Sequence, residues 1–242
     1  MSAIAINLTR RCAPTLGCIL LLAFALANAQ QLDQAALVRR IDAANQARYD
    51  RVMGFTDTEH YAVFRRKDES HPAAEMTVHM TYRKGAGKTY KILAQSGSPA
   101  ILRFGLRPLL ENEKAINDPA KVADSWFTSA DYDMQVRPEA VRMLKGRTCV
   151  GIVIKPRRKA PNMIDGMLWV YPVDGAIMEV EGIASKSPSV FARTTKMMRL
   201  YAIMDGYAMA IHARAESHNA IFGRTVVTID YSDYHLELRP QQ

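Results

Sequence analysis

Residues 76–94 read MTVHMTYRKGAGKTYKILA, and this stretch decides the class of fold. Apolar and polar side chains alternate over its first half, where one side carries Met76, Val78, Met80 and Tyr82. Alternation with a period of two is typical of a β-strand that has one buried and one solvated face. The glycines at 85 and 87 supply a turn, so residues 88–94 are predicted to return as the partner strand of a hairpin.

The turn of this hairpin also resembles the end of a phosphate-binding loop, because Gly87 is followed by Lys88 and Thr89. The full motif requires a glycine at the position of Tyr82 and a helix after the lysine. The tyrosine and the alternating flanks therefore favour a plain hairpin turn over a nucleotide site.

Further strands follow the hairpin along the chain. The β-branched run 147–155 stops at Pro156, and Asp174-Gly175 and Asp205-Gly206 are dipeptides favoured in hairpin turns. The segments that we expect as strands are 60–65, 76–82, 88–94, 147–155, 166–171, 176–183, 196–204, 207–216 and 224–231, the last extended by 234–238. Because no crossover helices separate them, the sequence predicts seven to ten strands in an antiparallel sheet.

Few helices accompany these strands. Apolar residues recur near a period of 3.6 over 32–52, which predicts a helix that we expect Gly54 to end. A second, short helix is predicted over 106–116, with Pro108 near its start. Residues 125–136 fit a helical turn or an edge strand equally well. The expected fold class is mainly β with one or a few helices (α+β).

The first 29 residues predict a cleaved secretory signal peptide. Arg10 and Arg11 precede an uncharged apolar run, and Ala27-Asn28-Ala29 fits the small-x-small pattern of signal peptidase sites. The run is shorter than the ~20 residues that a membrane-spanning helix needs. Cleavage after Ala29 leaves residues 30–242, which we expect to form a single domain in the periplasm.

Charge and residue types narrow the function. The 32 Lys and Arg exceed the 24 Asp and Glu, a formal net charge of +8 that weakly favours anionic surfaces or acidic partners. Nucleic acid is not expected as a partner of an exported chain. The six histidines lack zinc-site spacing, and no nucleophile elbow is present. Cys149 stands among aliphatic residues, which predicts a buried thiol. The sequence therefore predicts no catalytic site, no metal and no cofactor.

Two features suggest binding surfaces. The segment Lys155-Pro156-Arg157-Arg158-Lys159 is either a solvated loop or a docking patch for phosphate headgroups or an acidic partner. Methionine side chains adapt to variable apolar shapes, although an ordinary core uses them as well. Eight methionines lie on predicted strands: Met76, Met80, Met167, Met178, Met197, Met198, Met204 and Met209.

Taken in chain order, these features resemble the LolA/LolB-like superfamily of outer-membrane lipoprotein-sorting and carrier proteins of the bacterial periplasm. The resemblance spans roughly residues 31–238. Besides the signal peptide and the leading helix, it is carried by LKGRTCVGIVIKP at 144–156, GMLWVY at 166–171, the turn at 174–175, EVEG at 179–182 and YSDY at 231–234.

The resemblance implies a half-open β-barrel, a strongly curved antiparallel sheet whose apolar concave face is partly covered by helices. Members of the superfamily carry lipoprotein acyl chains or bind other lipids or peptides.

We therefore expect a periplasmic carrier of acyl chains, served by a membrane-associated donor or acceptor protein. A contiguous apolar face of this kind usually marks a binding site. The alternation selects as its lining Phe64, Met76, Val78, Met80, Tyr82, Met167, Trp169 and Tyr171. The pattern does not tell which face of the sheet is concave. The alternative is an envelope protein-interaction module, such as a stress sensor that grips an anti-sigma factor; an exported hydrolase is a third reading.

Overall fold

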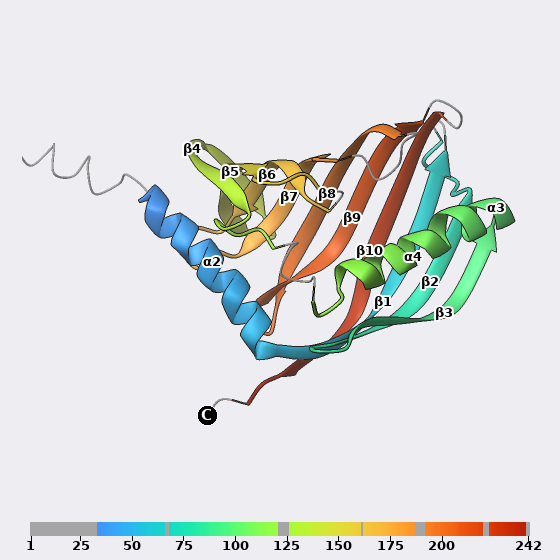
Figure 1. Cartoon of the computed structure of the whole chain (residues 1–242), viewed down its shortest axis with the longest axis horizontal. Coiled ribbons are helices and arrows are strands. Elements are labelled where there is room, and N and C mark those ends of the chain that lie inside the picture. The colour runs from blue at the N-terminus through green and yellow to red at the C-terminus, as the bar shows by residue number, and fades with distance from the viewer. Residues whose placement is uncertain are drawn as a thin grey trace, which may run out of the picture. The chain divides into compact units, whose positions relative to one another are not determined.

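One antiparallel sheet of ten strands dominates the described part of the chain, as Figure 1 shows. The computed structural model describes residues 33–65, 68–120, 126–160, 162–186, 192–219 and 223–240, so the expected signal peptide lies outside the described residues. The mainly β class, the antiparallel pairing and the upper bound of the strand number are confirmed.

The order of strands in the sheet is β3-β2-β1-β10-β9-β8-β7-β6-β5-β4. Neighbours in the sheet are also neighbours in the chain, except that β1 pairs with β10, the last strand. Among the described residues β3 and β4 do not pair with each other, so the sheet is open. The strands are β1 (Val52–Arg65), β2 (Ala74–Arg83), β3 (Gly87–Gly97), β4 (Tyr132–Leu144), β5 (Arg147–Pro156), β6 (Ile164–Val170), β7 (Ile177–Ala184), β8 (Ala192–Met204), β9 (Tyr207–Asn219) and β10 (Gly223–Leu238).

The leading helix α2 (Gln34–Arg51) passes directly into β1. The expectation that Gly54 ends this helix is wrong, because Gly54 is a residue of β1. A Cβ atom at this position would lie 2.9 Å from the carbonyl oxygen of Tyr82, so glycine permits the close approach of β2.

A second helical segment consists of α3 (Pro99–Ile101), the π-helix η1 (Leu102–Leu106) and α4 (Arg107–Ile116) in direct succession. The short helix predicted over 106–116 is thus confirmed, with Pro108 in its first turn. Of the two alternatives for 125–136, the strand is present, since β4 begins at Tyr132.

A row of paired residues crosses the sheet and defines its two faces. Residues paired directly across antiparallel strands point to the same side. The row runs Leu168, Val180, Arg199, Ala213, Ile229, Tyr61 and Met76. We call the side that carries these residues the inner face. Leu106 of η1 and Leu110 of α4 pack on it against Tyr61, Met76 and Ile229, which agrees with the position of α4 in Figure 1.

The opposite face has its own small core near β5 to β7. Cys149, Trp169 and Met178 are buried together there, which confirms the expected burial of the thiol. Arg142 lies over the Trp169 ring, 4.0 Å from its centroid, and its Nη1 donates to Glu179 Oε1 over 2.6 Å. Because this small core is buried, the opposite face of the sheet is not exposed to solvent along its whole width.

The turn between β6 and β7 supports helix α2. Gly175 has a φ of +78°, and a Cβ atom there would lie 2.4 Å from the carbonyl carbon of Arg40. The Arg40 guanidinium also donates to the Pro172 carbonyl oxygen over 3.1 Å. The turn at 174–175 therefore needs its glycine both for backbone conformation and for the approach of the helix.

Gly175→Ala should lower the free energy of unfolding by more than about 2 kcal/mol. The left-handed conformation costs a residue with a Cβ atom about 1 kcal/mol, and the clash with Arg40 adds to that. Gly206→Ala is the matched control, because Gly206 has a φ of +88° in the β8–β9 turn but nothing within 4 Å of its Cβ position. Urea unfolding of both variants measures the difference; equal losses would contradict the contact between turn and helix.

Candidate functional site

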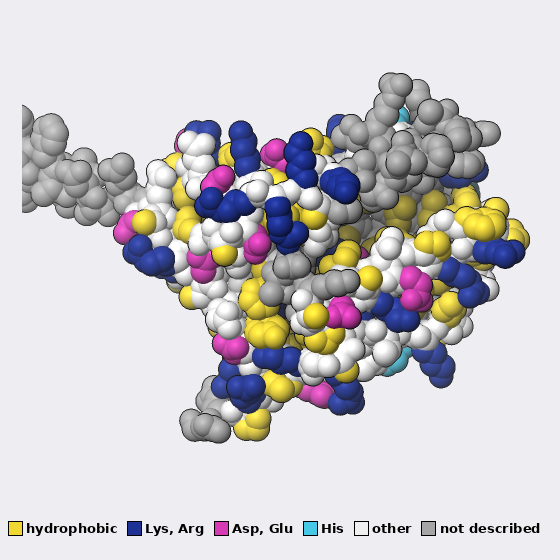
Figure 2. Space-filling view, in the orientation of Figure 1, with side chains coloured by type: hydrophobic (Ala, Val, Ile, Leu, Met, Phe, Trp, Pro, Cys, Tyr) yellow, Lys and Arg dark blue, Asp and Glu magenta, His cyan; other side chains and the backbone are white. Residues whose placement is uncertain are grey.

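A cavity of about 970 Å³ lies between helices α2 and α4 and the inner face. Its walls come from both helices, the segment 126–127 and the strands β1 to β3 and β6 to β10. Figure 2 shows hydrophobic side chains between the two helices. Most lining side chains are aliphatic or aromatic. They include Val52, Phe55, Tyr82, Leu109, Ile116, Trp126, Phe127, Ile164, Ile177, Val180, Met197, Met209, Ala213, Ala215, Val227 and Ile229.

The residues expected on β2 lie on the inner face, and one of them lines the cavity. Tyr82 is in its wall. Met76 and Val78 are fully buried beneath Leu106 and Leu110, where they hold the helical segment on the sheet. Met80 is buried in a second cluster together with Phe55 and Met209, both of which line the cavity.

The other expected lining residues lie elsewhere. Trp169 and Met167 neighbour the inner-face residue Leu168 in the strand, so they point to the opposite face, where Tyr171 packs with them. Phe64 also points away from the inner face, because it stands three positions from Tyr61 on β1. Alternation tells which residues of a strand share a face, but not which face of the sheet that is. The selected residues of β2 lie on the inner face, whereas those of β6 lie on the opposite face.

Two of the eight strand methionines, Met197 and Met209, line the cavity with inner-face side chains. Met198 borders the cavity as well, but it pairs with Glu181 and its side chain points to the opposite face. The basic segment 155–159 lies beside the cavity. Arg158 is in the cavity wall, and Arg157 pairs with Asp133 over 2.8 Å. Lys155 and Lys159 are exposed. Only Arg158 of this segment thus belongs to the cavity wall.

Charged side chains in the cavity wall form a network that joins β1, β3 and α4. Lys88 Nζ of β3 lies 3.7 Å from Glu59 Oε1 of β1 and 3.5 Å from Glu113 Oε2 of α4. Tyr61 donates its hydroxyl proton to the other oxygen of Glu59. Burial alone would lower the pKa of Lys88, but the carboxylates of Glu113 and Glu59 raise it above its ordinary value. Lys88 therefore stays charged and joins the sheet to α4.

Arg199 of β8 brings a second cation to the same wall. Burial by itself would lower its pKa, but the neighbouring Tyr231, Tyr201 and Glu113 raise it. In Glu113 the burial that favours the neutral acid is outweighed by Lys88 and Arg199, which lower its pKa. Buried charges of both signs thus stabilise one another at this wall.

Asp57 is the exception in this network. It is 1% exposed, lines the cavity, and neither of its carboxylate oxygens has a hydrogen-bond partner among the described residues. The hydroxyl of Tyr234 lies near it but donates to the carbonyl oxygen of Ala210 over 2.8 Å. Burial, assisted by the charge of Glu59, raises the pKa of Asp57 to about 7.

The sequence reasoning did not find Asp57, Glu59, Lys88, Glu113 or Arg199. A signal for two of them existed, because Phe55, Asp57, Glu59, Tyr61 and Val63 alternate on one face of β1. Two carboxylates on an otherwise apolar face of a strand indicate a buried polar site. Lys88 was considered only as part of the glycine-rich turn.

No group of three or more metal-ligating side chains occurs in the described ranges. Within those ranges, no helix is both long and apolar enough to cross a membrane.

No protein-family model and no curated protein matches this chain. Solved structures similar to it include a DUF1329 family protein from Desulfovibrio piger, with 11% identity, 87% of this chain and 95% of that chain covered, and a TM-score of 0.43. A LolA superfamily protein from Nitrosomonas europaea has 12% identity, coverages of 85% and 94%, and a TM-score of 0.44. A putative outer membrane lipoprotein-sorting protein domain from Vibrio parahaemolyticus has 14% identity, coverages of 84% and 93%, and a TM-score of 0.45.

One of these structures bears the name of the superfamily that the sequence resembles. What the cavity binds has to be argued from its own residues.

Asp57→Asn should stabilise the protein in a pH-dependent way. A raised carboxyl pKa favours the folded state fully below the ordinary value of 3.8, and this contribution is lost as the pH rises to about 7. Above pH 7 the buried charge costs up to about 4 kcal/mol, which the amide avoids. Urea unfolding between pH 4 and pH 8 should show a gain that grows with pH.

Asp50→Asn is the control for this prediction, because the Asp50 carboxylate accepts a hydrogen bond from Gln46 and lies outside the cavity wall. Its effect should not follow the same pH course. A gain from Asp57→Asn that is constant over the whole range would show that burial does not raise this pKa.

Proposed function

We propose that this protein is a periplasmic carrier that holds an apolar ligand, such as the acyl chains of a lipid or lipoprotein, in the cavity on its inner face. In this proposal the open sheet is a half-open barrel with the inner face as its concave side, and α2 and α4 form its cover. The observation that carries the proposal is the cavity of about 970 Å³ lined mainly by aliphatic and aromatic side chains.

The size of the cavity suits this role. Binding sites for small molecules measure about 300–1,000 Å³, so the volume is at the upper end. Burial of a hydrocarbon chain contributes about 0.8 kcal/mol for each methylene group, so ten buried methylenes contribute about 8 kcal/mol. This is comparable to the about 4–15 kcal/mol that association costs, which gives reversible rather than permanent binding.

The lining suits a ligand of variable shape. The flexible side chains of Met197 and Met209 adjust to chains of different length and branching. Alanines on β9 leave space above the sheet, since Ala213 and Ala215 lie in the wall on the inner face, paired with Arg199 and Met197. The proposed ligand therefore lies along β9 and β10, under α4.

In this proposal the basic segment 155–159 contacts a charged group, either on the ligand or on a partner protein. Arg158 lines the cavity, and Lys155, Arg157 and Lys159 are exposed beside it. These side chains can contact a phosphate headgroup, or an acidic surface of a donor or acceptor protein, during transfer.

The direct test is mass spectrometry of the organic extract of the purified mature protein, together with calorimetric titration of long-chain lipids. We expect co-purifying acyl compounds and saturable binding. Ala215→Phe should lower the affinity at least about tenfold by filling the cavity, equivalent to about 1.4 kcal/mol.

His218→Phe is the matched control, since it adds the same ring to the same strand at an exposed position outside the cavity wall. The proposal fails if the extract contains no lipid and neither the unchanged protein nor the control binds an acyl ligand.

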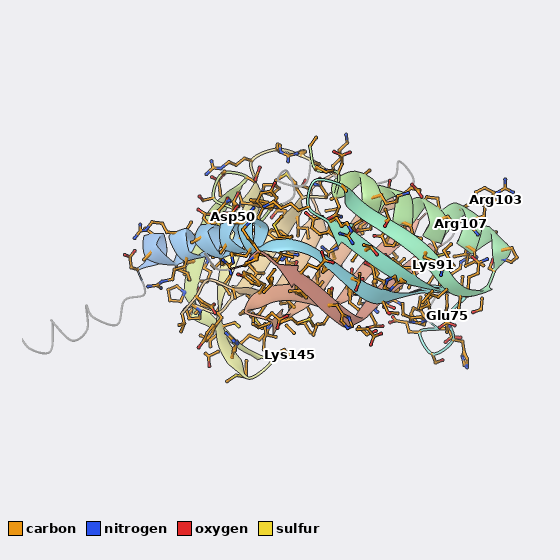
Figure 3. All side chains as sticks on the ribbon, turned by 90° about the horizontal axis from the view of Figure 1, so that it is seen from below. Asp50, Glu75, Lys91, Arg103, Arg107 and Lys145 are labelled. Carbon is orange, nitrogen blue, oxygen red and sulfur yellow. The ribbon has the colours of Figure 1, made fainter. Side chains whose placement is uncertain are left out.

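A second candidate function, the protein-interaction module, is favoured by one observation. Strand β3 pairs only with β2 among the described residues, and Leu93 and Ile92 on it are 54% and 37% exposed. A free strand edge with apolar side chains can pair with a strand of another protein. Lys91 lies on the same strand (Figure 3), and its charge limits nonspecific association.

Site-specific photo-crosslinking separates this candidate from the carrier. A crosslinker that replaces Leu93 should give one discrete protein adduct in envelope preparations if β3 is an interface. The same crosslinker at Lys145, in the β4–β5 turn, should give none. Absence of an adduct at position 93, or equal labelling at both positions, contradicts the interaction role.

A further inference from the structure

One part of the cavity wall combines a carboxylate with aromatic rings. Phe55 precedes Asp57 by two residues on the same face of β1. The centroid of the Phe55 ring lies 5.2 Å from that of Tyr82 and 5.8 Å from that of Tyr234. All four side chains line the cavity. Aromatic faces beside a carboxylate are the combination that binds ammonium groups in proteins.

The backbone around Asp57 is built to place this residue. The pairing of β1 with β10 shifts register between Thr56, which faces His235, and Thr58, which faces Ser232. Asp57 thus stands opposite an extra residue on β10, where Asp233 adopts a φ of +54° and Tyr234 follows. Bulges of this kind re-aim side chains and are common at binding sites.

Asp57 leaves room for one more cation at its own part of the wall. Arg48, Arg158, Arg199 and Arg214 also line the cavity, but the cation that acts on Asp57 is Lys88. Lys88 is already engaged by Glu59 and Glu113. Among the described residues Asp57 has no ion pair of its own, and the hydroxyl beside it, that of Tyr234, donates to the carbonyl oxygen of Ala210.

We propose that Asp57, Phe55, Tyr82 and Tyr234 form a headgroup subsite that binds a protonated amine carried on an aliphatic chain. The inference rests on the proposed function, because the chain of the ligand would occupy the apolar part of the same cavity.

The three common headgroups differ in what they offer this subsite. An ammonium group donates hydrogen bonds to both Asp57 oxygens, neutralises the charge of Asp57 and lies against the ring faces. An alcohol donates one hydrogen bond but carries no charge. A fatty acid carboxylate is repelled by Asp57 and Glu59.

Entry of an amine headgroup into the subsite requires a small rearrangement, because neighbouring atoms cover both Asp57 oxygens. Tyr82 and Tyr234 are only partly buried and can turn aside.

The test compares decylamine, decanol and decanoate by isothermal titration calorimetry of the purified mature protein at pH 8. We expect decylamine to bind at least about tenfold more tightly than decanol, and decanoate to bind most weakly. Asp57→Asn should remove the preference for the amine. Asp50→Asn, which removes a carboxylate outside the cavity wall (Figure 3), should retain the preference.

A second measurement uses the unchanged protein and does not depend on the folding of a variant. Because the pKa of Asp57 is raised to about 7, its protonation should reduce the preference for decylamine over decanol between pH 8 and pH 6. The charged and titratable groups around it are Glu59 on β1, Lys88 on β3, Tyr82 on β2 and Tyr234 on β10, with Arg48 of α2 beside Tyr82. Of these, Lys88 stays charged and the pKa of each tyrosine is raised, so neither tyrosine ionises in this range.

The outcomes separate the two proposals. If none of the three ligands binds, the carrier function itself is wrong. If decanol and decylamine bind alike at pH 8, or the preference survives Asp57→Asn, the carrier function stands and the amine subsite is overturned.

Discussion

The ion pairs of Lys88 with Glu59 and Glu113 are the interaction on which the cavity depends. They join strand β1, the edge strand β3 and helix α4 at a largely buried place in the cavity wall. A buried cation with two carboxylate partners is expensive to separate, since removal of one partner leaves an uncompensated charge. Together with Leu106 and Leu110 it holds the helical segment at a fixed position over the inner face, and the space beneath α4 remains.

The same wall combines two opposing requirements. Aliphatic side chains and small alanines make an apolar surface, whose removal from water is favourable. The buried carboxylates of β1, in contrast, need hydrogen-bond or ionic partners. Glu59 has Tyr61 and Lys88, and Asp57 has none among the described residues. The unpartnered Asp57 therefore costs little stability only while its carboxyl group is protonated. This asymmetry distinguishes the wall from an ordinary packed core.

Much of the fold could be predicted from local patterns. Alternation over 76–82 and the dipeptides at 174–175 and 205–206 placed β2, β6 to β9 and their turns, because these signals depend only on neighbouring residues. The start of β1 was missed, since Asp57 and Glu59 interrupt the apolar alternation that marks a strand. The facing of Trp169 and Met167 could not be predicted either, because an alternating pattern is symmetrical until the sheet register is known.

The binding site itself depends on distant parts of the chain. Asp57 and Tyr234 meet only because the first strand pairs with the last, and Lys88 meets Glu113 only because α4 returns over the sheet. No spacing in the sequence encodes such meetings. Composition did give the types of side chain that line the cavity, but not which of them do so.

The pairing of β1 with β10 also sets the order in which the molecule can assemble. A polypeptide that is exported or synthesised from its N-terminus delivers β1 early and β10 last, so the centre of the sheet stays incomplete until nearly the whole chain has emerged. Long-range strand pairing of this kind is slow, and it leaves apolar edges exposed meanwhile. Truncation of even the last dozen residues therefore removes the partner of the segment that carries Asp57.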